Sequence, residues 1–255
     1  GATYVAYLFA HDAGGFGDSG SDNVISCGSY TGNGSTTGPT VTLGYEPQWL
    51  LIKRASGGTG NWVLIDSMRG LVNSTTATPS DAYLVPNTTA AEQTWGDFTG
   101  TSNAAIPLAT GFQIVTSTAT LNNNTDTFIY IAIRRGPMKT PTTGTSVFQP
   151  TTYTGNNTYP RTLNTTITPD LSISRARFST NTDPHNNFFV DRLRGGEPTL
   201  ASTLTAAEDS PNGFFFDTQN GVRFVSVTSS KHNNSVDDYI NLSFRRAPGF
   251  FDVVC

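Results

Sequence analysis

Short runs in which apolar and polar residues alternate occupy most of this chain. The runs are rich in β-branched and aromatic residues and end at Gly, Pro or Asn, which is typical of strands with one buried face. Turn-forming pairs such as Asn33-Gly34 and Asn220-Gly221 suit tight β connections. Helical periodicity is nearly absent, so we predict an all-β fold. The expected strands are residues 4–10, 24–27, 40–43, 48–53, 62–66, 112–117, 128–134, 162–167, 171–178, 188–191, 213–216, 222–228 and 239–244.

Internal repetition organises the chain. Five short motifs occur twice, in the same order in both halves. They are YTGN at 30–33 and 153–156, LIDSMRG at 64–70 and FVDRLRG at 189–195, TAAE at 89–92 and 205–208, GF at 111–112 and 213–214, and Tyr-Ile before two arginines at 130–135 and 239–246. We therefore predict two tandem β-sandwich units, residues 23–137 and 146–248, joined by a linker at 138–145.

The two ends of the chain resemble parts of these units. Residues 4–9 resemble the closing strand at 239–244, and residues 252–255 resemble the opening strand at 23–27. Residues 1–22 are then a closing strand of a preceding unit plus a linker, and 249–255 begin a following unit. Either the sequence is an excerpt of a longer chain, or its end strands complete sheets in neighbouring subunits. Both alternatives give an extended, self-associating assembly, with Tyr4, Val5, Tyr7, Phe9, Val253 and Cys255 as its contact residues.

Composition and charge exclude several classes of protein. Charged residues make up 13% of the chain and the net charge is −4, whereas a nucleic-acid-binding protein carries a basic face. No apolar run is long enough to cross a bilayer, so we expect no membrane insertion. The three Trp, nine Tyr and 16 Phe occur in alternating runs that can fill a core, which argues against disorder. The two cysteines, Cys27 and Cys255, fall at equivalent repeat positions and assign no compartment.

Several of these strings resemble a known family. YVAYLFAHD, CGSYTGNGS, VTLGYEPQWLLIKRASG, NWVLIDSMRG, LVPNTTAAE and GFQIV are similar to a repeated domain in virion proteins of tailed phages that infect mostly marine and cyanobacterial hosts. The resemblance is close for residues 1–137 and loose for 146–255, where Pro169-Asp170-Leu171 replaces Pro47-Gln48-Trp49. It implies concanavalin-like jelly-roll sandwiches within a tail fibre or other surface protein, located on the virion or outside the cell.

A few residues are candidates for ligand binding. An aromatic ring can stack on a sugar, and Trp95, in a polar loop, and Tyr83 are the candidate glycan contacts; Trp49 and Trp62 lie in strands and are expected in the core. Asp18 and Asp22 offer oxygens to Ca²⁺ but lack the spacing of a calcium loop, so a plain linker is the alternative. The pairs Asp66/Arg69 and Asp191/Arg194 fix strand-to-loop corners or, alternatively, bind Ca²⁺ or sugar hydroxyls.

Catalysis has little support in the sequence. A glycosidase needs two carboxyl groups about 5–10 Å apart, but Glu92 and Glu208 belong to different units. No nucleophile elbow or zinc-binding motif is present. We therefore expect a non-enzymatic structural module of a fibre or filament, without a cofactor. The alternative is a carbohydrate-binding module that recognises host surface glycans and takes part in host attachment.

Overall fold

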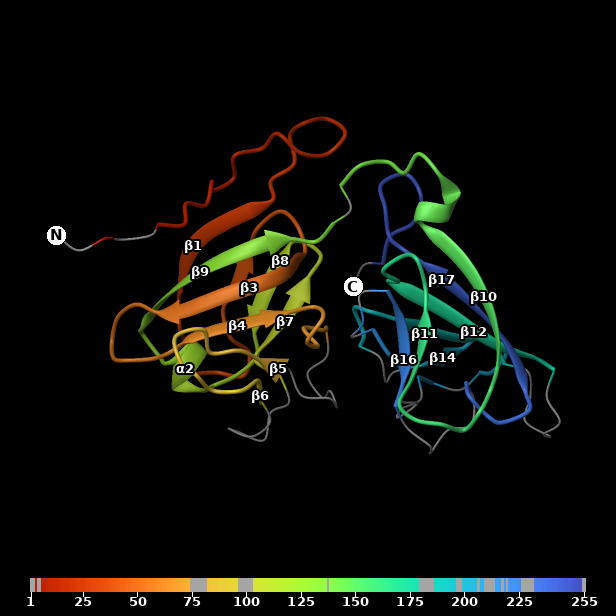
Figure 1. The fold of residues 1–255 in the computed structure, drawn as a ribbon. Coiled ribbons are helices and arrows are strands. Elements are labelled where there is room, and N and C mark those ends of the chain that lie inside the picture. The colour runs from red at the N-terminus through yellow and green to blue at the C-terminus, as the bar shows by residue number, and fades with distance from the viewer. Residues whose placement is uncertain are drawn as a thin grey trace.

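The computed structural model describes residues 3, 6–73, 82–95, 103–136, 138–178, 186–195, 199–205, 207–208, 214–216, 218, 220–225 and 232–253. Nearly all of its regular secondary structure is antiparallel β-sheet, which confirms the all-β fold class. In the described part of the chain the helical elements are the short α-helix α2 (Ala119–Asn122) and the 3-10 turn η1 (Gly144–Ser146). Figure 1 shows two bodies side by side, which we call the first sandwich (24–136) and the second sandwich (147–246).

The first sandwich contains a large sheet and smaller sheets. The large sheet has the order β1-β9-β3-β4, and the sheet β2-β8-β7 lies behind it in Figure 1. A two-stranded sheet, β5-β6, lies at one end. The strands are β1 (Ile25–Thr31), β2 (Thr40–Thr42), β3 (Pro47–Arg54), β4 (Trp62–Asp66), β5 (Ala82–Tyr83), β6 (Gln93–Thr94), β7 (Ala105–Leu108), β8 (Gly111–Ile114) and β9 (Thr127–Arg134).

The second sandwich repeats this topology. Its large sheet has the order β10-β17-β12-β13-β14, and its small sheet has the order β11-β16-β15. The strands are β10 (Phe148–Thr154), β11 (Arg161–Asn164), β12 (Leu171–Phe178), β13 (Phe188–Asp191), β14 (Leu200–Ala201), β15 (Phe214–Phe215), β16 (Gly221–Phe224) and β17 (Asp238–Phe244). The order β10-β17-β12-β13 matches β1-β9-β3-β4, as expected from the repeated motifs.

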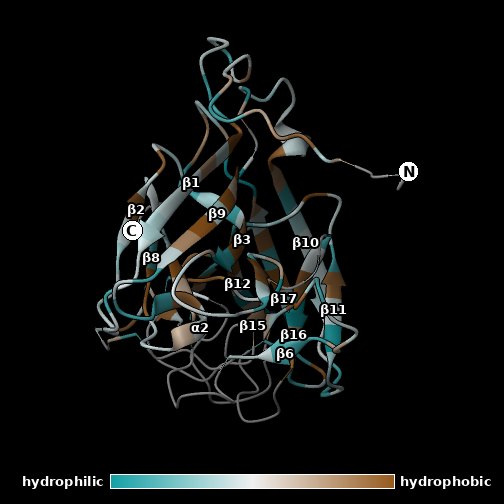
Figure 2. Cartoon of the chain, turned by 90° about the vertical axis from the view of Figure 1, so that its left-hand side faces the viewer, coloured by the Kyte–Doolittle hydropathy of each residue, from teal (hydrophilic) through white to brown (hydrophobic). Residues whose placement is uncertain are grey.

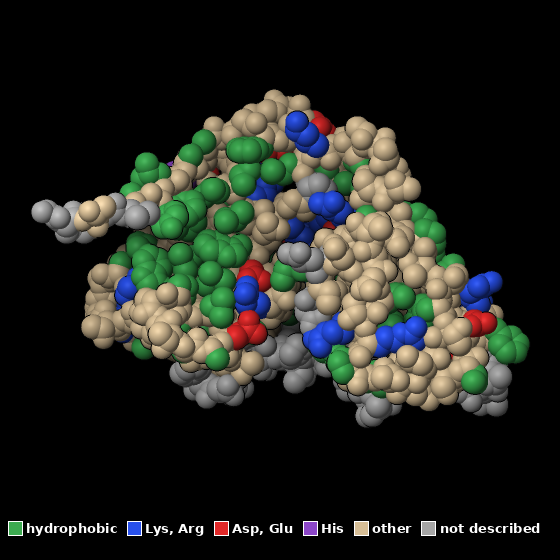
Figure 3. Space-filling view, viewed as in Figure 1, with side chains coloured by type: hydrophobic (Ala, Val, Ile, Leu, Met, Phe, Trp, Pro, Cys, Tyr) green, Lys and Arg blue, Asp and Glu red, His purple; other side chains and the backbone are tan. Residues whose placement is uncertain are grey.

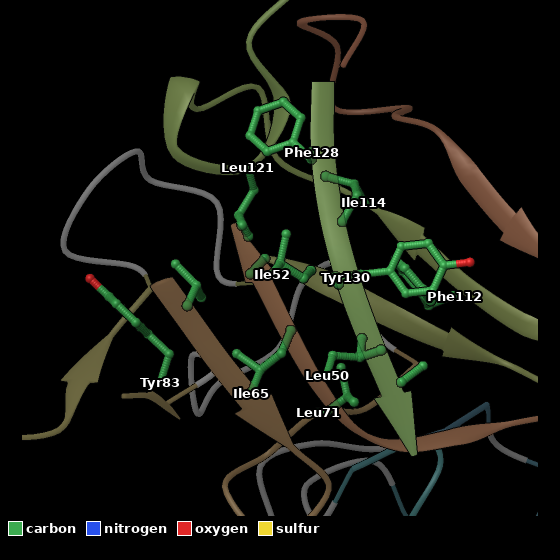
Figure 4. Packing of buried hydrophobic residues seen from close by; sticks show 14 of the residues in the cluster. Leu50, Ile52, Ile65, Leu71, Tyr83, Phe112, Ile114, Leu121, Phe128 and Tyr130 are labelled. Atoms are coloured by element: carbon green, nitrogen blue, oxygen red, sulfur yellow. The ribbon is translucent and has the colours of Figure 1, made fainter. Parts of the chain in front are cut away.

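Each sandwich has its own hydrophobic core. In the first, the inward side chains of the large sheet, such as Leu50, Ile52 and Ile65, meet Phe112 and Ile114 from β8 (Figure 4). Tyr30 stacks on Phe128 with ring centroids 5.1 Å apart. The core of the second sandwich is smaller and consists of Leu163, Val190, Phe214, Phe216, Val222 and Phe224.

The strand pairing corrects two details of the repeat. By sheet order β8 corresponds to β16 and not to β15, so Gly111 is equivalent to Gly221, and the expected equivalence of the GF strings at 111–112 and 213–214 is wrong. Tyr30 pairs with Phe128, and the equivalent Tyr153 pairs with Tyr239. Tyr239 therefore occupies the position of Phe128, and the expected equivalence of Tyr130 and Tyr239 is wrong by two residues. Phe244 and Ile133 pair with the first residues of β10 and β1, so the arginine pairs that follow them are equivalent, as expected.

Two strand expectations differ from the structure. Residues 6–10 were expected to continue a strand, but they carry no strand, and Tyr4 and Val5 lie outside the described residues. Strand β10 was missed because Pro150 lies inside it. Proline is tolerated there because β10 is an edge strand, whose outward N–H groups need no partner in the sheet.

The YTGN turns are held by a second repeated motif. Asn122 and Asn233, both fully buried, each accept the backbone N–H of the turn asparagine through Oδ1, at 2.8 Å for Asn33 and 3.1 Å for Asn156. These asparagines begin the strings NNNTD (122–126) and NNSVD (233–237). Thr125 and Val236 occupy the same position of the two strings and both have positive φ, at 68° and 69°. The two loops therefore share one strained backbone conformation.

Gly32 and Gly155 should be irreplaceable in these turns. A Cβ at Gly32 would lie 2.1 Å from the carbonyl oxygen of Asn123, and one at Gly155 would lie 1.8 Å from that of Asn234. We expect Gly32→Ala and Gly155→Ala each to lower the free energy of unfolding by about 1–3 kcal/mol or more, as overpacking does. Urea unfolding measures this. Gly136→Ala, where a Cβ meets nothing within 4 Å, is the control, and equal losses in all three variants would contradict the prediction.

Candidate functional site

The expected exposed aromatic residues are buried. Trp95 is 1% exposed and Tyr83 is 3% exposed, and both belong to the core of the first sandwich, where their ring centroids lie 5.0 Å apart. The expectation that Trp95 is exposed in a polar loop is therefore wrong. Trp95 directly follows the short strand β6, which pairs with β5, and its indole lies in the core against Tyr83 of β5.

For Trp49 and Trp62 the expectation is wrong in the opposite direction, because both lie on the outer side of the sheet. They were expected in the core, but their neighbours Leu50 and Val63 fill it, so the alternation of the strand turns both indoles outward with intermediate exposure. Cross-strand pairing places Leu51 opposite Leu64 between them. The two rings are therefore part of a larger apolar surface.

This surface, which we call the first outer face, covers the outside of the β1-β9-β3-β4 sheet. One column of side chains across the sheet is Cys27, Ile131, Leu51 and Leu64, and the flanking columns add isoleucines and tryptophans. Figure 3 shows apolar side chains gathered over this sheet, and Figure 2 shows apolar residues in brown on β9 and β3. The face consists of Ile25, Cys27, Trp49, Leu51, Trp62, Leu64, Ile129, Ile131 and Ile133.

The second sandwich has an equivalent apolar surface, the second outer face. It consists of Phe148, Pro150, Leu171, Ile173, Phe189, Ile240, Leu242 and Phe244, all partly or fully exposed. In β12 and β17 most of the inward residues are polar, since Ser172, Ser174, Asn241 and Ser243 are buried, whereas Tyr239 of β17 and Val190 of β13 are inward and not polar. Ser172 donates to Asn241, and the Asn241 amide donates to Ser243 at 2.9 Å. The middle of this sheet therefore has polar side chains inside and apolar side chains outside.

The candidate metal ligands have other partners. Asp18 accepts hydrogen bonds from the backbone N–H and the hydroxyl of Thr140, and these bonds lower the pKa of its carboxyl. Asp22 forms an ion pair with Arg134 at 3.1 Å. In the described part of the chain no three His, Cys, Asp or Glu side chains gather as a metal site would require. The N-terminal loop therefore binds both the first sandwich, through Asp22, and the linker, through Asp18.

The repeated acidic and basic residues form one ion trio in each sandwich. Arg69 pairs with Asp66 and, through Nε, with Glu92 at 2.8 Å. Arg194 pairs with the equivalent Asp191 and Glu208, but with its nitrogens exchanged: Nε faces Asp191 and Nη1 faces Glu208. The corner role expected for the Asp/Arg pairs agrees with this geometry. The glutamates of the TAAE motifs, which the sequence left without a role, complete the trios.

The N-terminal segment is exposed but anchored at its end. Tyr7 and Leu8 are 83% and 94% exposed, and Phe9 is exposed as well. The Asp12 N–H donates to the carbonyl of Ile25 at 2.9 Å, and Nδ1 of His11 accepts the N–H of Cys27 at 3.1 Å. Residues 11–12 thus occupy part of the open edge of β1. At the other end of the chain, Val253 is partly buried outside any strand, and Cys255 lies outside the described residues.

A buried ionic network joins the two sandwiches. Arg135 of the first sandwich pairs with its own Glu46 at 2.7 Å and with Asp170 of the second. Arg246 of the second sandwich pairs in turn with Glu46, and its backbone N–H donates to Asp170 at 2.8 Å. Arg135 and Asp170 are each only 7% exposed. Because Arg135 and Arg246 are repeat equivalents, each sandwich offers an arginine to a carboxylate at the other's edge.

Arg192 extends this network into the second sandwich. Its guanidinium lies 3.4 Å from Asp170 and donates to the carbonyl oxygens of Pro169 and Phe216. Burial lowers its pKa to about 10, with Asp170 opposing this shift and Arg135 adding to it. Burial also acts to lower the pKa of Arg135, but Asp170 and Glu46 outweigh it, so that this pKa is raised. Both arginines are therefore charged at neutral pH.

The loops beside the network come from the same corner of each sandwich. Residues 66–73 follow β4, and residues 191–195 follow β13, its equivalent. The Asn73 N–H donates to the carbonyl of Leu193, and Nη1 of Arg192 lies 3.3 Å from the sulfur of Met68. The junction is therefore built from one corner of the fold used twice.

Comparison with known families matches residues 1–137 of the 255 to the domain of unknown function DUF7483. The chain belongs to this family. The match covers the N-terminal segment and the whole first sandwich, and it ends directly after the arginine that enters the junction. No curated protein and no solved structure matches the chain. Among the described residues, no helix is long and apolar enough to span a membrane.

Trp95 is buried and Trp62 is partly exposed, so their replacement should affect stability differently. We expect Trp95→Ala to lower the free energy of unfolding by about 3–5 kcal/mol, because it leaves a large cavity in the core. Trp62→Ala, on the first outer face, should cost only about 1 kcal/mol. Chemical unfolding of the two variants checks this. A loss for Trp62→Ala as large as that for Trp95→Ala would place the Trp62 ring in the core after all.

The junction provides the next prediction. Asp170→Asn removes the charge that faces Arg135 and Arg192, so two buried guanidinium groups lose a partner. We expect a loss of stability of about 3–5 kcal/mol, as for other broken buried ion pairs. Asp252→Asn is the control, because Asp252 pairs with Arg246 from an exposed position and such pairs contribute at most about 1 kcal/mol. Equal, small losses of stability for both variants in thermal unfolding would show that the buried network does not stabilise the protein.

Proposed function

We propose that the chain is a non-enzymatic structural module of an extended extracellular assembly, such as a phage tail fibre or another virion surface protein. In this proposal the two bodies are tandem jelly-roll sandwiches, and copies associate head to tail. The observation that carries the proposal is the buried network at the junction. Two binding domains on a flexible linker need no such contact. Neighbouring units of a fibre, in contrast, must keep one fixed orientation.

The linkers add to this rigidity. Thr140, in the linker between the sandwiches, binds Asp18 of the N-terminal loop and lies within 3.7 Å of the position that a Cβ at Gly249 would take. The segment before the first sandwich, the linker and the turn after the second sandwich are therefore in sequential contact. Such contacts restrict the angle between the two bodies.

The placement of the carboxylates supports a non-catalytic role. Glu46, Asp66, Asp126, Asp170 and Asp191 are buried, and each is paired with an arginine. A catalytic acid or base needs access to a substrate and a proton to exchange. These ion pairs instead hold strand ends and the junction together.

Carbohydrate binding is the second candidate function, and the outward position of Trp49 and Trp62 favours it. A sheet whose outer side presents two partly exposed indoles can stack against sugar rings. A glycan array with the wild-type chain and a Trp49→Ala, Trp62→Ala double variant tests it. Binding that the double variant loses, while it keeps its fold, would support recognition of host glycans.

Removal of the N-terminal segment tests the structural proposal. Because Tyr7 and Leu8 are 83% and 94% exposed, we expect them to bind a neighbouring copy. The full chain should increase in mass with concentration in analytical ultracentrifugation. Deletion of residues 1–10 should leave both sandwiches folded but weaken this association. A monomeric full chain, or a deletion variant that associates equally well, would contradict the proposal.

A further inference from the structure

The two outer faces are apolar surfaces whose side chains are at least partly exposed in the described part of the chain. We propose that the first outer face of one copy packs, sheet on sheet, against the second outer face of another copy. This inference rests on the proposed function, because it names the surfaces through which the assembly grows.

The direction of the side chains shows that these faces need a cover. In β12 and β17 the alternation of serine and asparagine with Leu, Ile and Phe would fit an ordinary sandwich if the apolar half pointed inward. The structure has Ser172 and Asn241 inside and Ile173 and Leu242 outside. A contiguous apolar surface on a water-exposed sheet marks an interaction site. At these positions of β12 and β17 the outward side chains are therefore more apolar than the inward ones.

The two faces match in size, and each has an uncharged apolar centre. Each spans four strands and three columns of side chains, which corresponds to roughly 15 Å by 15 Å of sheet. That area suits the apolar centre of an interface, around which a polar rim completes the usual ~800 Å² per partner. Lys53 and Arg175 lie at the same end of the two faces, and Asp66 and Asp191 at the opposite end are already paired with arginines. Lys53 and Arg175 carry the same charge, so the two faces can pack only with these ends apart, over their uncharged apolar centres.

Association through the sheet edges is blocked at equivalent points. Cys27 in β1 and Pro150 in β10 occupy the same position in their sheets, opposite Ile131 and Leu242. His11 accepts the N–H of Cys27, and Pro150 has no N–H to donate. Proline and occupied donors are ways in which edge strands avoid pairing with another chain. At the β1 and β10 edges, strand pairing between copies is therefore hindered, and contact through the faces is favoured over contact through these two edges.

The arrangement of the faces favours growth over closure. In Figure 1 the large sheet of the first sandwich faces the viewer, whereas in the second sandwich the small sheet with β11 and β16 lies in front. The same view in Figure 3 shows mainly apolar side chains over the first sheet and mainly polar ones over the second sandwich. A contact between two different faces that point in different directions leaves one face of each kind free. Further copies can then add.

The experiment uses two substitutions at the centres of the faces. Ile131→Lys disrupts the first outer face and Leu242→Lys the second, and Thr36→Lys, at an exposed position outside both, is the matched control. Sedimentation velocity over a range of concentrations measures association, and circular dichroism confirms that each variant is folded. We expect the wild type and Thr36→Lys to form species larger than dimers. Each face variant alone should associate at least about 30-fold more weakly, as for a central interface residue.

A mixture of the two face variants is the decisive sample. Each variant keeps the face that the other has lost, so the mixture should form a 1:1 dimer that cannot grow. A mixture that stays monomeric, or Leu242→Lys dimers without a partner, would overturn the inference; the latter would show that the first face pairs with itself. If both variants still polymerise like the wild type, the inference fails but the proposed function stands. A wild type that never associates overturns both.

Discussion

A β-strand presents every second side chain to the same side, so each sheet of a sandwich buries one of its faces in the core and turns the other outward. In β3 of this protein both sets are apolar: Leu50 and Ile52 enter the core, and Trp49 and Leu51 face outward. In β12 the inward residues Ser172 and Ser174 are serines, and the outward residues Leu171 and Ile173 are apolar. The choice of core residues and the apolar character of the outer faces both follow from which set turns inward. Because the two sets lie on opposite faces of the sheet, a substitution in the inward set does not change how far the outward side chains are exposed.

The repeated motifs explain how the two sandwiches keep one topology while their cores diverge. The YTGN turns are held by buried asparagines, and the corners after β4 and β13 are held by an aspartate, an arginine and a glutamate. All of these are polar contacts with fixed geometry at the ends of strands. They align the strands even where Leu50 and Ile52 of one sandwich are replaced by Ser172 and Ser174 of the other. The second sandwich can therefore accept a polar sheet interior and a smaller core.

Much of the fold could be predicted from the sequence, because strands and repeats are local patterns. The repeated Asp/Arg pairs also predicted their corners, since partners three residues apart leave few alternatives. The side of the sheet on which Trp49 and Trp62 lie could not be predicted, because an apolar run on both faces gives the same alternation in either direction. Trp95 follows a two-residue strand too short to show a pattern. The junction was missed because Glu46 and Arg246 lie 200 positions apart, and only the folded chain brings them together.

The junction joins the two sandwiches through buried charges at corners that have diverged. Arg135 of the first sandwich reaches Asp170 of the second, and Arg246 of the second reaches Glu46 of the first. The two arginines are repeat equivalents, but the two carboxylates are not. Leu171 has the register of Trp49, so the counterpart of Asp170 is Gln48, and the counterpart of Arg192 is Ser67. Burying an arginine is costly unless a carboxylate faces it. The charge of Arg192 is therefore matched by the carboxylate of Asp170, and both belong to the second sandwich alone.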